Sequence, residues 1–199
     1  MGPMTIAHHV VALLAAAAAV TAAYQQDADK PVIDNERVTV WHLTGTARPA
    51  ATMPAGCVSV RLAPSIDVAF SSNCAQAARA PAAESVVIGL KALRVPPLAN
   101  TSGVPNAFPR ANGKQWLDND RVVVWDYTWT TGVPTPMHFH DKDVVVIYLE
   151  AGGVKSTTPD GQSVVNEVSR GLIRFNNRER IHTEELVSGK SRAIIVELK

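Results

Sequence analysis

The sequence predicts an all-β protein built from two β-rich units in tandem. Two observations support this fold class. The apolar runs of the chain are short, rich in Val and Ile, and bounded by Gly, Asp, Asn and Pro, which is typical of strands in a sandwich or barrel. Strand-like segments of the first half also recur in the same order in the second half, which indicates a duplicated unit.

Three pairs of segments carry the repeat, and the first pair matches at six of eight positions. The pairs are 34–41 with 118–125, 57–62 with 144–149, and 84–91 with 192–199. The first copy is shorter in its middle: 21 residues (63–83) separate its second and third segments, against 42 (150–191) in the second copy. We therefore expect the first unit to be degenerate.

The two units are joined by a segment rich in Pro and Gly, which predicts a linker or long loop. We place the first unit at 24–95, the linker at 96–117 and the second unit at 118–199. The first unit contains a single histidine, His42, whereas the second unit contains three. The other two histidines of the chain lie in the N-terminal segment. We therefore expect the first unit to have a structural role and the second unit to carry the functional site.

The residues before the first unit predict export. Val10–Val20 is an apolar run of 11 residues, too short to cross a bilayer as a helix. The small residues that follow suit signal peptidase, with cleavage after Ala22 or Ala23. We expect a signal peptide over 1–23 and a secreted or periplasmic mature protein, with no membrane partner after cleavage. The alternative is an uncleaved anchor or a buried helix.

The charge balance of the chain excludes two classes of expected partner. The chain has 19 basic and 18 acidic residues and a net charge of +1, so neither nucleic acid nor an anionic membrane surface is an expected partner.

Cys57 and Cys74 could form one disulfide in an exported chain or remain two buried thiols. The chain has no Cys-x-x-Cys, so neither a thioredoxin-like motif nor a zinc ribbon is indicated.

Three histidines of the second unit form the most informative pattern. His138 and His140 are two residues apart, so on a strand they point to the same face. His182 follows after a β-rich stretch long enough for strands to return beside them. Neutral imidazole nitrogens suit first-row divalent metals. We therefore predict a three-histidine metal site inside a small β-barrel.

Around these histidines the second unit resembles the cupin superfamily. The first cupin motif is a glycine, five residues, His-x-His and a later glycine; here these fall on Gly132, His138, His140 and Gly152. The second motif is a glycine, ten intervening residues and a histidine, which fits 171–182. The motifs cover the second unit, and the repeat extends the resemblance weakly to 34–91. The resemblance implies two fused cupin barrels (double-stranded β-helix, or jelly roll), the first of them degenerate.

The chain departs from the motifs at four positions. The glutamate that is normally a metal ligand falls on Val145, the Pro and Gly of the second motif are Asn177 and Glu179, and its last Asn is Leu186. A site with three histidines and no carboxylate resembles the cupin-type cysteine dioxygenases and the diketone-cleaving dioxygenases, which hold ferrous iron. The resemblance implies Fe²⁺ as cofactor, with Zn²⁺, Ni²⁺ or Mn²⁺ as alternatives.

Two carboxylates lie near the predicted ligands. Strand alternation puts Glu184 on the face of His182, where it could act as general base or orient an imidazole; the alternative is an ion-paired carboxylate at the barrel rim. Asp143 could replace the missing glutamate as fourth ligand, but Asp141-Lys-Asp143 looks more like a solvated turn.

Large side chains could complete the pocket. Tyr127 shares a strand face with Trp125 and Trp129, and we expect that row to be core. Tyr148 and Arg174 could reach the cavity, where an arginine would hold a carboxylate substrate through a forked hydrogen-bonded pair. The alternative for Arg174 is an outward surface position.

The resulting functional hypothesis is a metal-dependent enzyme acting on a small organic molecule, with dioxygenase-like chemistry first. A hydrolase, lyase or isomerase with a redox-inert metal is the alternative among enzymes. A protein that binds a metal or small ligand without turnover is the alternative outside them, because fold does not settle function. The resemblance also implies tight subunit association, as in a homodimer.

Overall fold

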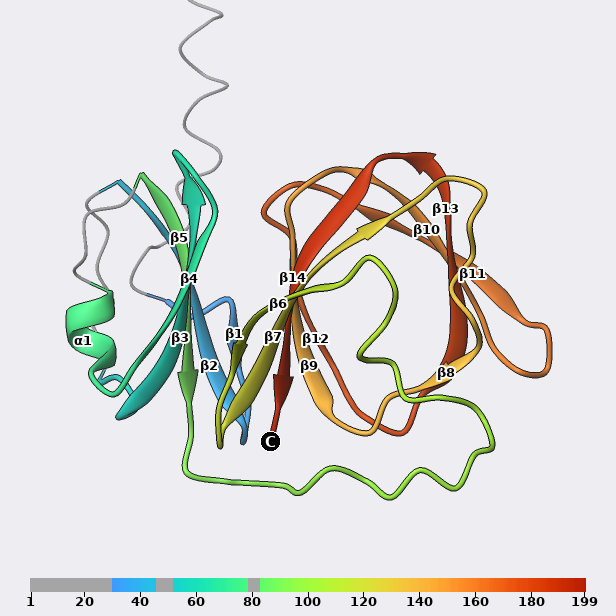
Figure 1. Ribbon diagram of the computed structural model, residues 1–199. Coiled ribbons are helices and arrows are strands. Elements are labelled where there is room, and N and C mark those ends of the chain that lie inside the picture. Colours follow the sequence, from blue (N-terminus) through green and yellow to red (C-terminus); the bar gives the residue numbers. More distant parts are fainter. Residues whose placement is uncertain (1–29, 46–51, 79–82) are drawn as a thin grey trace, which may run out of the picture.

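The computed structural model describes residues 30–45, 52–78 and 83–199 (Figure 1). Within these ranges the chain consists of antiparallel strands and one short helix, which confirms the all-β prediction. The signal peptide predicted at 1–23 lies outside the described residues. None of the helices in the described ranges has the length and apolar character that a bilayer crossing requires.

The C-terminal unit consists of two antiparallel sheets that enclose one core. In spatial order, the first sheet holds β12 (Ile173–Asn176), β9 (Asp143–Tyr148), β14 (Ser191–Leu198), β7 (Val122–Trp129) and β6 (Lys114–Asp118). The second holds β11 (Ser163–Val168), β10 (Gly152–Thr157), β13 (Ile181–Gly189) and β8 (His138–Phe139). This is the double-stranded β-helix that the motifs predict.

The N-terminal unit is a single five-stranded sheet in the described residues. Its strands, in spatial order, are β1 (Ile33–Asp34), β2 (Val38–Thr44), β5 (Glu84–Leu90), β3 (Gly56–Ala63) and β4 (Asp67–Ser71). This differs from the closed barrel that we expected for the first unit. The sheet buries one face against the β12-β9-β14-β7-β6 sheet of the C-terminal unit, so that three layers lie side by side (Figure 1).

Side-chain alternation explains how one sheet of the C-terminal unit serves two cores. On β7, Val122 and Val124 face the N-terminal sheet, whereas Val123 and Trp125 face the barrel interior. The first core is made of Val, Ile and Leu side chains contributed by both units. The N-terminal sheet therefore occupies the outer face of the C-terminal barrel and leaves the barrel interior to the histidines.

The sequence repeat corresponds to the same strand order in both units. β1, β2, β5 and β3 take the places in their sheet that β6, β7, β14 and β9 take in theirs. Equivalent ion pairs recur as well: Lys91 binds Asp34 in the first unit, and Lys199 binds Asp118 in the second. The four strands β8, β10, β11 and β13 have no counterpart among the described residues of the first unit. The first copy is thus reduced to the sheet that does not carry the histidines.

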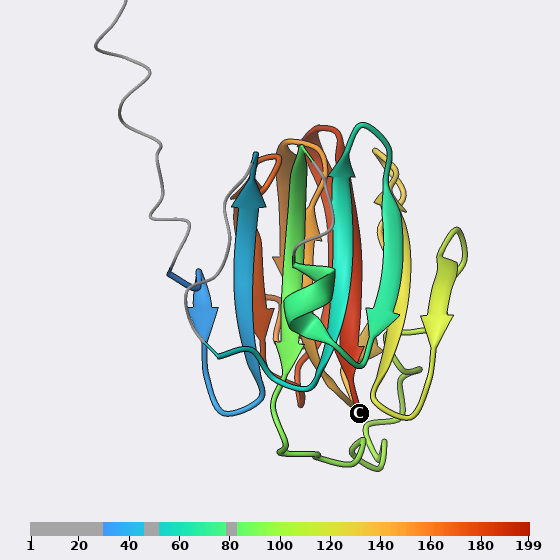
Figure 2. The same ribbon diagram turned by 90° about the vertical axis from the view of Figure 1, so that its left-hand side faces the viewer.

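The short helix α1 (Cys74–Ala77) covers the outer face of the N-terminal sheet (Figure 2). Asn73 caps it by accepting a hydrogen bond from the backbone N–H of Gln76. Cys57 on β3 and Cys74 on α1 belong to the same apolar cluster, and both are buried free thiols. Of the two alternatives for Cys57 and Cys74, a disulfide or two buried thiols, the structure shows the buried thiols.

Candidate metal centre

Strand pairing brings the three histidines together. β8 pairs antiparallel with β13, and His138 lies directly opposite His182. Directly opposite residues share one face of a sheet. His140 follows two residues later, and its backbone N–H donates to the carbonyl of Arg180, 2.9 Å away. That bond keeps the chain beside the start of β13, so His140 projects to the same side.

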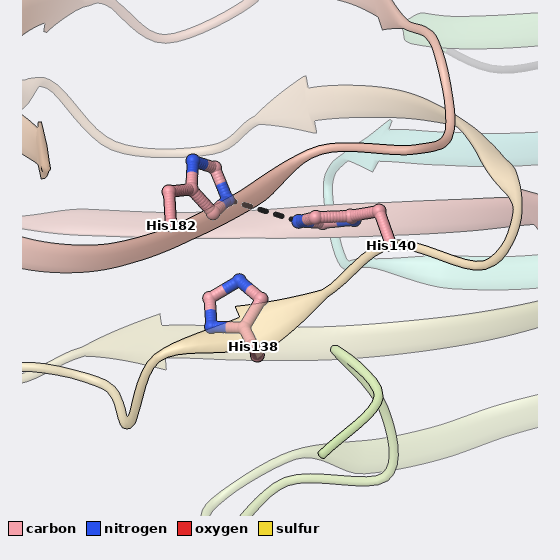
Figure 3. A group of neighbouring side chains, drawn as sticks. All are labelled: His138, His140 and His182. Carbon is pink, nitrogen blue, oxygen red and sulfur yellow. Dashed lines mark hydrogen bonds between the residues drawn. The ribbon is translucent and has the colours of Figure 1, made fainter. Parts of the chain in front are cut away.

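The imidazole rings converge in a buried cluster (Figure 3). One ring nitrogen from each of the three side chains lies within 4.8 Å of the others. The closest pair is His140 Nε2 and His182 Nε2, 2.9 Å apart. The structure thus brings together all three predicted ligands, from two segments more than 40 residues apart.

Hydrogen bonds outside the cluster orient two of the rings. His138 Nδ1 lies 2.8 Å from the carbonyl oxygen of Pro136, which can only accept, so His138 is protonated at Nδ1 and keeps a lone pair on Nε2. His182 Nδ1 lies 2.8 Å from Ser156 Oγ. Such partners fix the ring orientation of metal-binding histidines.

Burial keeps the histidines neutral. It lowers the pKa of His138 to about 4 and that of His140 to about 2, and the positive charges of Arg110 and Arg180 add to the respective shifts. Burial also lowers the pKa of His182. Neutral imidazoles are the form that binds metal.

The donor set fits a divalent ion. Metal–nitrogen bonds of about 2.0–2.1 Å place the ligand nitrogens about 3 Å apart, close to the separation of His140 and His182. Two ring nitrogens facing each other need either a shared proton or a shared cation. His140 Nδ1 is buried and has no hydrogen-bond partner in the described structure, unlike the outer ring nitrogens of His138 and His182.

Glu184 lies beside the cluster on the face of β13 that carries His182. Its Oε1 is 3.9 Å from His182 Nε2, and its Oε2 accepts hydrogen bonds from Arg110 (2.9 Å) and Trp129 Nε1 (3.3 Å). Burial alone would raise the pKa of Glu184, but the charge and hydrogen bond of Arg110, together with His182 and His138, outweigh burial and hold that pKa well below its usual range. Glu184 is therefore an ionised carboxylate within reach of the site.

Arg110 is a site residue that we did not predict from the sequence. It comes from the linker, which runs along one end of the molecule to the region of β8 (Figure 1). There Phe139 donates to the carbonyl of Pro105 (2.8 Å), and Ala107 donates to the carbonyl of Phe139 (2.7 Å). The Arg110 Nε donates to the carbonyl of Ala107 (2.7 Å). Nothing in the local sequence distinguishes this arginine, because its position depends on the pairing of the linker with β8.

Asp143 lies away from the histidines. It is buried, pairs with Arg37 of the N-terminal unit, and accepts a hydrogen bond from the backbone N–H of Arg178. It is not in the group of side chains that could share a metal. The solvated turn that we expected for 141–143 is also wrong, because Asp141 and Asp143 are both buried and the first unit covers Asp143.

A small cavity of about 30 Å³ lies inside the barrel, lined in part by His140, Tyr148, Arg180 and Glu184. Tyr148 thus reaches the cavity as predicted, and burial raises its pKa to about 12. Arg174 does not line the cavity; it donates to Asn166 and to the Glu167 carbonyl on β11. The cavity holds about one water, so any substrate must approach from another side.

The row of aromatic residues on β7 is core, as predicted. Tyr127 packs edge-on against Trp129, with ring centroids 5.0 Å apart. Trp129 nevertheless serves the site as well, because its indole N–H donates to Glu184.

Glu179 occupies the glycine position of the second motif and has a left-handed backbone, with φ at +71°. Its N–H donates to the carbonyl of His140 (2.7 Å). The left-handed conformation destabilises a non-glycine residue by about 1–2 kcal/mol. Glycine avoids this strain, but it loses more conformational entropy on folding, which costs about 0.5–1 kcal/mol. We predict that Glu179→Gly raises the free energy of unfolding by about 0.5–1 kcal/mol, measured by urea denaturation.

Asn112→Gly is the matched control, because Asn112 has φ at +63° and asparagine tolerates that conformation. The free energy of unfolding of this variant should not rise, and the chain-entropy cost of glycine should lower it by about 0.5–1 kcal/mol. Destabilisation by Glu179→Gly would mean that the glutamate side chain contributes more than its backbone strain costs.

Comparison with known proteins gives likenesses to solved structures only. No family model matches the sequence, and no curated protein matches it. A cupin domain from Bordetella pertussis Tohama I is 27% identical and is similar over 48% of this chain and 96% of its own, with a TM-score of 0.41.

Two further likenesses cover similar shares of the chain. An RmlC-like cupin with a double-stranded β-helix from Methanocaldococcus jannaschii is 11% identical over 53% of this chain and 91% of its own (TM-score 0.37). A polyketide cyclase from Streptomyces resistomycificus is 21% identical over 52% and 80% (TM-score 0.36).

Proposed function

We propose that this chain, a cupin by the strand order and motif histidines of its C-terminal unit, is an exported metal-dependent enzyme that acts on a small organic molecule. Dioxygenase-like chemistry is the leading form. The observation that carries the proposal is the buried cluster of His138, His140 and His182, with ligand nitrogens within 4.8 Å of one another. Export rests on the apolar run and small residues of the first 23 positions.

A site with three protein ligands leaves coordination positions open, unlike a closed structural site. Within the described residues, no carboxylate or thiolate joins the three histidines as a fourth member of the group. With neutral ligands the full positive charge of a divalent ion remains, which favours an anionic substrate. Ferrous iron held there would supply oxygen activation, whereas zinc or nickel would supply a Lewis acid.

The residues around the cluster have separate roles in this proposal. In this proposal Glu184 acts as general base, because its Oε1 lies 3.9 Å from a ligand ring nitrogen. Arg110 and Trp129 hold its Oε2, which leaves Oε1 to face the histidines. Ser156 and the Pro136 carbonyl fix the orientations of His182 and His138.

The test is oxygen uptake by the Fe²⁺-loaded protein with a panel of small diketones, thiols and carboxylic acids. We expect uptake with at least one of them, none with the Zn²⁺-loaded protein, and a decrease of about 100-fold in Glu184→Gln at unchanged iron content. Anaerobic turnover with zinc or nickel would contradict the oxygenase hypothesis and favour a hydrolase, lyase or isomerase. Thermal stabilisation by a compound without any product would indicate a binding protein instead.

A further inference from the structure

A second and larger pocket lies outside the barrel core, next to His138. Its volume is about 300 Å³, in the range of sites for small organic ligands. Two segments form it: linker residues 105–112 and residues 130–136, which lead from β7 to β8. His138 thus belongs both to the histidine cluster and to the wall of this pocket.

The lining is mostly apolar, with two asparagines, two threonines and one charged side chain. Proline, alanine and valine side chains and the Tyr127 ring make up most of the wall. Arg110 is its single charged side chain, since no Asp, Glu or Lys lines the pocket and His138 is neutral. A mostly apolar cavity with one guanidinium, whose NH1 already pairs with Glu184, fits a ligand with an apolar body and one negative group that can accept hydrogen bonds.

Arg110 is held in place with its guanidinium between the pocket and the histidines. Its Nε donates to the Ala107 carbonyl, its NH1 to Glu184, and its NH2 lies 3.3 Å from His138 Nε2. Its guanidinium carbon lies 4.3 Å from the centre of the Phe108 ring and 4.7 Å from that of Tyr127. Stacking on two rings holds the side chain in one conformation before any ligand arrives.

One donor of Arg110 points at a lone pair that a metal would use. His138 carries its proton on Nδ1, so the Nε2 lone pair is its only metal-binding site. Once that lone pair is occupied, the NH2 group of Arg110 loses its acceptor, and a buried charged donor without an acceptor is costly. A carboxylate oxygen from the pocket would restore the bond.

We propose that this pocket binds a small carboxylate with an apolar body, and that Arg110 holds its carboxylate beside the histidine cluster. The inference rests on the proposed function in that it names the substrate class of the same site. It also makes Arg110 a ligand-binding residue supplied by the linker.

The test is calorimetric titration of the Zn²⁺-loaded protein, which cannot activate oxygen, with benzoate and with benzamide as its uncharged counterpart. We expect benzoate to bind about tenfold more tightly than benzamide. Arg110→Met should remove that preference, whereas Arg94→Met, in an exposed pair with Asp120, should keep it. Equal binding of the two compounds, or no binding of benzoate, would overturn the proposal.

A second pair of variants avoids the buried arginine. Val133 lines the pocket and is 58% exposed, and Val164 on β11 is 59% exposed and lies outside it. Val133→Asp puts a like charge in the wall of the pocket and should weaken benzoate binding about tenfold, whereas Val164→Asp should leave it unchanged. Equal effects of the two substitutions would contradict the assignment of the pocket.

Titration of the metal-free protein separates this inference from the proposed function. Arg110-dependent benzoate binding by a protein that takes up no metal would retain the carboxylate site and reject the metalloenzyme. Stoichiometric metal binding without a preference for benzoate would reject the carboxylate site and retain the metalloenzyme.

Discussion

Asp143→Asn is expected to lower the free energy of unfolding by about 3 kcal/mol. The pair between Asp143 and Arg37 joins the two units, and its side chains are only 11% and 5% exposed. Without the carboxylate, the buried charge of Arg37 loses its ion-pair partner and keeps a long hydrogen bond (3.5 Å) to the Lys199 carbonyl. The measurement is urea denaturation at neutral pH, followed by tryptophan fluorescence.

Two further variants show whether the cost arises from the buried charge. Asp67→Asn breaks an ion pair with Arg61 whose side chains are 51% and 40% exposed, and it should cost less than about 1 kcal/mol. Adding Arg37→Met to Asp143→Asn should recover most of the lost stability, because no unpaired charge remains. A cost for Asp143→Asn equal to that of Asp67→Asn would mean that water reaches the pair.

This ion pair bears on the role of the N-terminal unit. Its sheet covers the outer face of the C-terminal barrel with a continuous apolar core, and Arg37 covers the buried Asp143. Loss of the first unit would therefore expose the barrel's apolar outer face and a buried carboxylate. We infer that the first unit stabilises the barrel and has no part in the metal centre.

The strands and the histidines could be predicted because both depend on local pattern. Side chains alternate between the two faces of a strand, so His138 and His140 share a face once their segment pairs with another strand. The spacing of the cupin motifs then identified His182 as the third ligand. The repeat likewise predicted which segments correspond in the two units. The first copy is visibly 21 residues shorter in its middle, but that length alone did not say that a whole sheet has no counterpart among the described residues of the first unit.

The remaining features depend on contacts between distant segments. Arg110 reaches the histidines because residues 105–107 pair with Phe139, and a Pro-rich linker carries no periodicity that would indicate this. Asp143 is buried because Arg37, 106 residues away in the sequence, covers it. The signal peptide, the homodimer and the catalytic role of Glu184 stay predictions.

The largest expected effect on the site is the loss of metal in the His138→Ala/His182→Ala double variant. Two of three ligands are removed, and affinity should fall more than 100-fold, well beyond the loss of about 10–100-fold for a residue that only orients a ligand. His42→Ala is the control, because His42 pairs with Glu84 in the N-terminal sheet, outside the cluster. Circular dichroism should confirm that all variants keep the β-fold.

Elemental analysis of the mature protein, purified without chelator or affinity-tag metal, tests the central claim most directly. We predict about one divalent ion per chain in the wild type and in His42→Ala, and none in the double variant. Iron would direct the search to oxygen uptake, whereas zinc, nickel or manganese would direct it to hydrolysis, elimination or isomerisation. A folded wild-type protein with no metal, even after incubation with Fe²⁺ or Zn²⁺, would contradict the metalloenzyme.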